Sequence, residues 1–162
     1  MSNISKLSSK LALLFKVLMI LYPTMVILMW SGMLNIPFGY TAFSRLPIQV
    51  DFDALDAGIK ISACLVQMIP ALVLTLGFYY LVQLFNLYSK NIIFARENIK
   101  LIRKIGYTLI LQAIAYIISQ PLLSLILTID APPGQHALVL SFGSYEITNL
   151  CVGTVVILIS II

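Results

Sequence analysis

The chain has 162 residues, of which 60% are hydrophobic and only 10% are charged. Soluble domains carry about 25% charged residues, so this composition excludes an ordinary soluble globular protein. The formal net charge of +4 would suit a polyanion binder, but the cations gather where membrane topology would place them, so we expect no direct nucleic-acid contact. The length leaves room for a single membrane domain, residues 1–162, and for no separate soluble domain.

Four long segments of the chain are almost free of charge. A helix needs about 20 apolar residues to cross a hydrocarbon core about 30 Å thick. We therefore predict an all-α fold, a four-helix transmembrane bundle. The expected spans are about 17–34, 58–88, 105–128 and 145–162. Trp30 and Tyr40 are expected as interfacial aromatics beside the first span. The fourth span is barely long enough to cross and ends on two isoleucines without a polar anchor, so we expect a C-terminal truncation.

The charged residues divide between the two sides of the predicted bundle. Eight of the ten cations fall on one side, namely Lys6, Lys10, Lys16, Lys90, Arg96, Lys100, Arg103 and Lys104. Five of the six acids fall on the other, namely Asp51, Asp53, Asp56, Asp130 and Glu146. Cations in short loops mark the cytoplasmic side. The prediction is a multi-pass protein with both ends in the cytoplasm.

No group of residues in the sequence indicates a reaction or a metal. The aspartates Asp51, Asp53 and Asp56 do not fit a calcium loop, which needs a Gly at the sixth position and a Glu at the twelfth. His136 is the single histidine and has no partner ligands near it in sequence. Nucleophile and phosphate-loop motifs are missing from the sequence. We predict a non-enzymatic protein without metal or cofactor. The two cysteines, at similar predicted depth, would be able to face each other: Cys64 and Cys151.

Polar side chains form a stripe on each of the two middle spans. They are Thr75, Tyr79, Gln83 and Asn86 on the second span, and Thr108, Gln112, Tyr116 and Ser119 on the third. Hydrogen bonds between such residues help helices to associate in lipid. The alternative interpretation is a polar path or small-ligand pocket between spans two and three, as in a small transporter or channel subunit.

The connector between these spans carries a dense group of cations. Those cations are Lys90, Arg96, Lys100, Arg103 and Lys104. Their spacing predicts a short basic amphipathic cytoplasmic helix at the membrane interface, which then turns into the third span. Its basic face would contact anionic headgroups. The alternative is a docking surface for a cytoplasmic protein partner, and a homo-oligomer is a further open alternative.

The same connector resembles the signature of a bacterial membrane family known only as domain of unknown function 2975. Members have a central motif of the form Lys-Gly-x-x-Phe-Ser/Thr-x-Glu-Asn, followed by an apolar-basic run and a Gly. The matching residues are Lys90, Phe94, Glu97, Asn98, Arg103 and Gly106. Asn91 stands where Gly is common, and Asn also tolerates a left-handed helix end. Ala95 stands where Ser or Thr is common, and Ala cannot cap a helix.

The resemblance implies a four-span protein of the bacterial inner membrane and supplies no activity. Genes of similar proteins often adjoin those of small helix-turn-helix regulators. We therefore expect a sensing, regulatory or interaction role that uses the cytoplasmic connector. The transporter or channel subunit remains the alternative.

Overall fold

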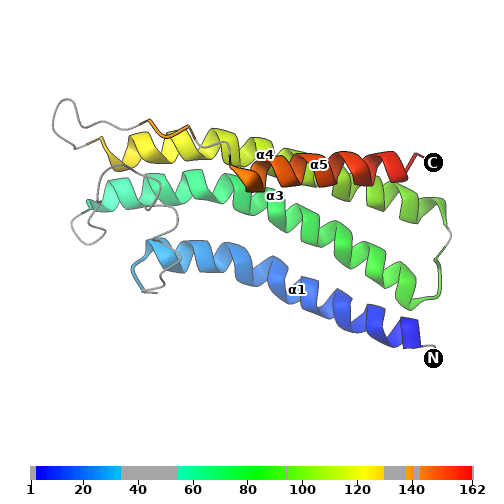
Figure 1. The fold of residues 1–162 in the computed structure, drawn as a ribbon. Coiled ribbons are helices and arrows are strands. Elements are labelled where there is room, and N and C mark those ends of the chain that lie inside the picture. Colours follow the sequence, from blue (N-terminus) through cyan, green and yellow to red (C-terminus); the bar gives the residue numbers. More distant parts are fainter. Residues whose placement is uncertain (1–2, 34–54, 94, 130–137, 141–142, 162) are drawn as a thin grey trace.

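The structure is a computed structural model that describes residues 3–33, 55–93, 95–129, 138–140 and 143–161. These residues form four helices: α1 (Asn3–Trp30), α3 (Ala57–Ser89), α4 (Arg96–Leu127) and α5 (Ser144–Ile159). Each helix packs against the next one in the chain, α1 on α3, α3 on α4 and α4 on α5 (Figure 1). The expected all-helical fold is therefore confirmed for the described part of the chain.

Three of the helices are long and apolar enough to cross a membrane, namely α1, α3 and α4. Their large apolar side chains are widely exposed, for example Ile20 (67%), Leu65 (65%) and Ile118 (52%). Apolar surface on this scale is unfavourable in water and is the normal outer face of a membrane helix. At 1.5 Å per residue the 33 residues of α3 extend about 50 Å, more than the hydrocarbon core requires.

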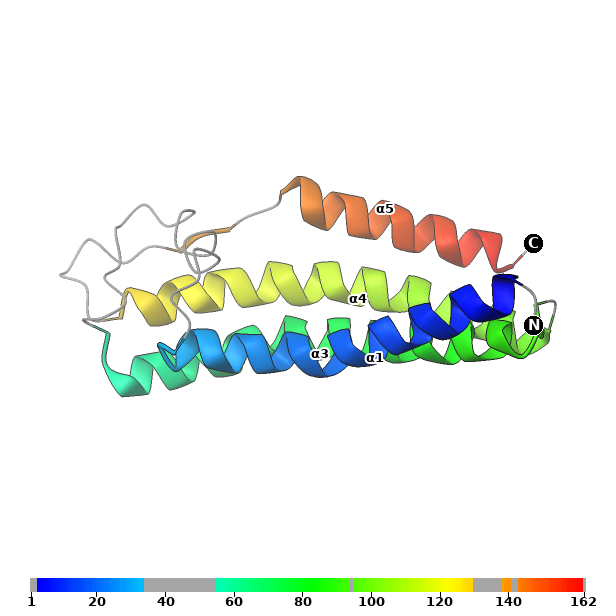
Figure 2. The same cartoon turned by 90° about the horizontal axis from the view of Figure 1, so that it is seen from below.

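The fourth helix differs from the expected span over 145–162. With 16 residues α5 is only about 24 Å long, less than a crossing requires. It lies along only part of α4, and its last turn lies at the same end of the bundle as the first turn of α1 (Figure 2). The first turns of α1 and the last turns of α5 thus lie at one end of the bundle, together with residues 90–93 and 95 (Figure 1). We call this the connector end. Which side of a membrane it faces stays a prediction.

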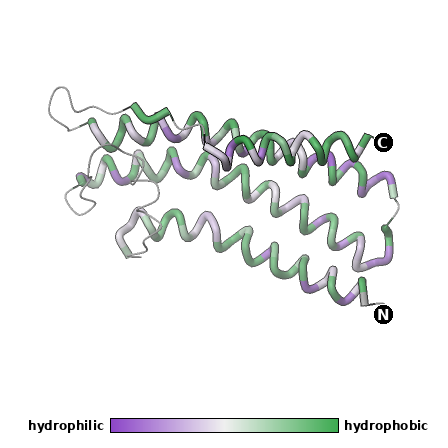
Figure 3. The backbone as a smooth tube through the Cα atoms, in the orientation of Figure 1, coloured by the Kyte–Doolittle hydropathy of each residue, from purple (hydrophilic) through white to green (hydrophobic). Residues whose placement is uncertain are grey.

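Hydrophilic residues are frequent toward the connector end of α1 and α4, while the middle of each helix is mostly apolar (Figure 3). At this end a hydrogen bond joins α1 to α3. Ser5 Oγ donates to the carbonyl oxygen of Ser89 at 2.7 Å. This bond satisfies one of the carbonyls that the end of α3 leaves without a helical partner.

The opposite end of the bundle has a small apolar core. Trp30, Ala63, Leu123 and Leu127 bring α1, α3 and α4 together there. Trp30 is only 3% exposed, and its Nε1 donates to Gln67 Oε1 at 2.7 Å. The indole of Trp30 therefore packs between helices and finds its hydrogen bond inside the bundle. Its expected depth at the membrane interface stays a prediction. Tyr40 lies outside the described residues.

Cys64 and Cys151 do not face each other, although their similar predicted depth allowed it. Both are free thiols. Cys64 packs beside the apolar core that contains Trp30. Cys151 is exposed on α5, two residues before Gly153, which contacts α4 at Gly106 near the connector end. The two thiols therefore lie at different depths, because α5 packs along the connector half of α4.

Candidate functional site at the connector end

The end of α3 is fixed by a left-handed turn at Asn91. Its φ is 61°. Its N–H donates to the Tyr88 carbonyl at 3.0 Å, and the Ile92 N–H donates to the Leu87 carbonyl at 3.1 Å. This pair of bonds is the Schellman arrangement that closes many helices. The sequence-based expectation that Asn91 can replace Gly at this position is confirmed.

Asn98 holds the short connector between α3 and α4. Its side chain is 3% exposed, and its Nδ2 donates to the carbonyls of Ile92 at 2.9 Å and Ile93 at 2.7 Å. The Asn98 backbone N–H donates to the Ala95 carbonyl at 3.0 Å. Because one side chain satisfies two connector carbonyls, the turn into α4 has a defined conformation. The Asn at this place in the motif therefore fixes the turn between α3 and α4.

The predicted separate amphipathic helix is not observed; its residues are the first turns of α4. The helix begins at Arg96, with Ala95 at the N-cap position and no side-chain cap. It then continues without a break to Leu127. Glu97 lies in the first turn, where a carboxylate interacts favourably with the helix dipole. Phe94, the remaining motif residue of this stretch, lies outside the described residues.

The connector cations divide into an exposed set and one bound residue. Arg96, Lys100 and Lys104 are exposed and recur every four residues, so they share one face of α4. Lys90 is exposed at the C-cap of α3. We call Arg96, Lys100 and Lys104 the cationic face. Arg103 behaves differently because it reaches α5.

Arg103 binds the end of α5. Its Nε donates to Ser160 Oγ and its Nη2 to the Ser160 carbonyl, both at 3.2 Å. The last carbonyls of a helix lack partners and carry partial negative charge. The motif arginine therefore caps α5 in this fold, which the sequence did not indicate because its partner lies 57 residues away.

Gly106 allows α4 and α5 to touch. A Cβ built on Gly106 would lie 2.9 Å from the Gly153 carbonyl oxygen and 2.7 Å from Ile157 Cγ1. A Cβ on Gly153 would in turn lie 2.8 Å from the Gly106 carbonyl oxygen. Contacts this short need Gly on both helices, as in other closely packed membrane helix pairs. The last residue of the family motif thus sets the α4–α5 crossing.

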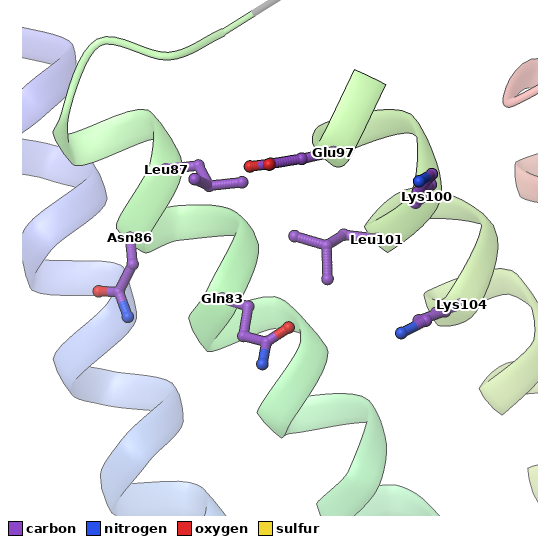
Figure 4. A pocket seen from close by; sticks show the side chains of 7 residues that line it. All are labelled: Gln83, Asn86, Leu87, Glu97, Lys100, Leu101 and Lys104. Carbon is purple, nitrogen blue, oxygen red and sulfur yellow. The ribbon is translucent and has the colours of Figure 1, made fainter. Parts of the chain in front are cut away.

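A groove runs between the last turns of α3 and the first turns of α4. Its volume is about 390 Å³. Gln83, Asn86 and Leu87 line it from α3, and Glu97, Lys100, Leu101 and Lys104 line it from α4 (Figure 4). Lys104 Nζ also lies 5.2 Å from the centroid of the Tyr80 ring. The groove is therefore lined both by Gln83 and Asn86 of the predicted polar stripe and by charged residues of the first turns of α4.

The remaining stripe residues have different surroundings. Thr75, Thr108 and Ser119 each donate a hydrogen bond to a carbonyl of their own helix. Tyr79 is 45% exposed. Gln112 is 2% exposed, and neither its Oε1 nor its Nε2 has a hydrogen-bond partner among the described residues.

Tyr116 belongs to a polar cluster that the sequence analysis missed. Its ring lies 5.3 Å from that of Tyr145 on α5. Glu146 is only 1% exposed in the first turn of α5, and its Oε2 accepts from the Gly143 N–H at 2.8 Å. The expected start of the fourth span near residue 145 agrees with the start of α5, and Glu146 caps that helix. A Glu three residues after the N-cap was the available signal.

Among the described Cys, Asp and Glu residues, none gather in groups that would hold a metal ion. Asp51, Asp53 and His136 lie outside the described residues. Asp56 caps α3, with its Oδ2 accepting from the Gly58 N–H at 2.8 Å.

Comparison with known proteins gives the same family that the connector motif resembles. Neither the curated proteins nor the solved structures contain a significant match to the chain. A family model described as protein of unknown function (DUF2975) matches residues 13–162. Since the match covers nearly the whole chain, including the connector, α3, α4, α5 and α1 from residue 13 onward, this protein belongs to the DUF2975 family.

Proposed function

We propose that this protein is a non-enzymatic regulator or sensor of the bacterial inner membrane, and that it acts through the connector end. The connector end would face the cytoplasm, as the distribution of cations favours. The observation that carries the proposal is the cationic face beside a fixed turn. Asn98 holds the connector through two hydrogen bonds, and Arg96, Lys100 and Lys104 remain exposed next to it.

A fixed turn with an exposed charged face suits recognition, because little conformational entropy is lost when a partner binds. The partner would be a cytoplasmic protein with an acidic surface, and anionic headgroups would hold the same face near the membrane. We assign no residue to catalysis and no cofactor to the chain.

The test replaces Arg96, Lys100 and Lys104 by Gln and measures which proteins co-purify after crosslinking in native membranes. Arg103 is left intact because it caps α5. The matched control replaces Lys6, Lys10 and Lys16, three exposed cations of α1, and so removes the same charge. We expect the first variant to lose a partner that the control retains. Equal recovery by both variants would refute recognition by the cationic face.

Gln112 favours a second candidate function, a small transporter or channel subunit with a path between α3 and α4. A buried amide without partners usually binds water or a ligand. The test is solute flux in reconstituted vesicles for the variants Gln83→Leu and Gln112→Leu. A path lined by these amides predicts that flux falls in both variants. Unchanged flux, or no flux in the unmodified protein, would discard this candidate.

A further inference from the structure

We propose that the groove between α3 and α4 binds the headgroup of one phospholipid, and that this headgroup carries an amine beside its phosphate. Two lysines, one glutamate and two side-chain amides line this cavity of about 390 Å³. The inference rests on the proposed membrane placement of the connector end and adds a ligand class to it.

The two lysines of α4 provide the phosphate side of the groove. Lys100 and Lys104 are four residues apart, so their side chains leave the same face of the helix. Both line the groove, and Lys104 extends toward Gln83 on α3 (Figure 4). The ammonium of Lys104 also lies over the Tyr80 ring, with Nζ 5.2 Å from the centroid, which restricts its position. Basic pockets between membrane helices are typical sites for lipid phosphates.

Glu97 places the opposite charge in the same groove. Its side chain points across the groove toward Leu87 and away from Lys104 (Figure 4). An ionised carboxylate only accepts hydrogen bonds, so it repels a bare phosphate and attracts an ammonium group. Two cations and one anion therefore match a phosphate that is followed by an amine. The amides of Gln83 and Asn86 supply neutral donors on the α3 side.

Apolar surface continues from the groove along both helices. On α4, Tyr107 and Leu111 follow Lys104 by three and seven residues, on the same face, and they are 57% and 45% exposed. On α3, Leu76 precedes Gln83 by seven residues and is 39% exposed. Acyl chains would cover this surface, whereas a soluble phosphoamine would not. The occupant is therefore a lipid.

The test is native mass spectrometry of the full chain after delipidation, with measured amounts of phosphatidylethanolamine or phosphatidylglycerol added. We expect the unmodified protein to bind one phosphatidylethanolamine in preference to phosphatidylglycerol. Replacing Lys100 and Lys104 by Gln should weaken that binding about thirtyfold. Replacing Lys6 and Lys10 by Gln removes the same charge from α1 and should leave the binding unchanged.

The variant Glu97→Gln separates recognition of the amine from recognition of the phosphate. It should abolish the preference between the two lipids while phosphatidylglycerol still binds. Equal binding of both lipids by the unmodified protein would overturn the inference, as would full binding without Lys100 and Lys104. Displacement of the lipid by an equal concentration of soluble phosphoethanolamine would overturn the lipid assignment. Equal partner recovery by the cationic-face variant and its α1 control, with intact lipid selectivity, would instead refute only the proposed function.

Discussion

Asn98 should be the residue on which the conformation of the connector depends most. The decisive substitution is Asn98→Asp, because it keeps the shape of the side chain but replaces the donating amide with a carboxylate. The structure gives the amide two bonds, to the carbonyls of Ile92 and Ile93 at 2.9 and 2.7 Å. A net hydrogen bond contributes about 1 kcal/mol, so Asn98→Ala should lower the free energy of unfolding by about 2 kcal/mol.

The Asp variant should be at least as unstable as the Ala variant. Its carboxylate would face two carbonyl oxygens from a position that is 3% exposed, and burial of an unpaired charge is costly. The assay is unfolding in mixed micelles followed by circular dichroism, with hydrogen exchange of residues 91–101. The matched control is Asn91→Gly, which keeps the left-handed turn and should preserve the free energy of unfolding. If the free energy of unfolding of the Asn98→Asp variant lies within about 0.5 kcal/mol of that of the unmodified protein, the amide does not hold the connector.

Three further substitutions test the contacts between helices. Gly106→Ala should displace α5, because the new Cβ would lie 2.9 Å from the Gly153 carbonyl oxygen. Gly77→Ala is the control, since its Cβ would lie 3.8 Å from its nearest neighbour. Crosslinking between α4 and α5 should fall in the Gly106→Ala variant and not in the control. Arg103→Gln should speed hydrogen exchange in the last turn of α5, and unchanged exchange would argue against the cap. Trp30→Phe should lower the free energy of unfolding by about 1 kcal/mol through loss of the bond to Gln67, and a stability equal to that of the unmodified protein would contradict that bond.

Much of the fold follows from local properties of the sequence. The charge-free segments are long enough to predict α1, α3 and α4, because helix formation and burial in lipid depend on a continuous run of apolar residues. Asn91 likewise indicates the left-handed end of α3, since the preference for that conformation belongs to the residue itself. The connector motif also pointed to the family that the comparison supports.

The site depends on contacts that no local pattern contains. The sequence places Arg103 and Glu97 beside each other in one basic run, but the structure directs Arg103 to α5 and Glu97 into a groove with α3. The sequence places Glu146 at the start of the fourth helix, but only the structure shows that its carboxylate is buried and accepts from the Gly143 N–H.

The sequence by itself determined which segments are helical and apolar, and it determined where the chain turns after α3. Only the tertiary structure decided that α5 crosses α4 at Gly106, and that the amides of α3 line one groove with the lysines of α4. The physical reason is the range of the interactions. Helix formation and lipid burial act along a few turns of chain, whereas a close backbone contact, a cap by Arg103 or a groove exists only after distant helices have packed together.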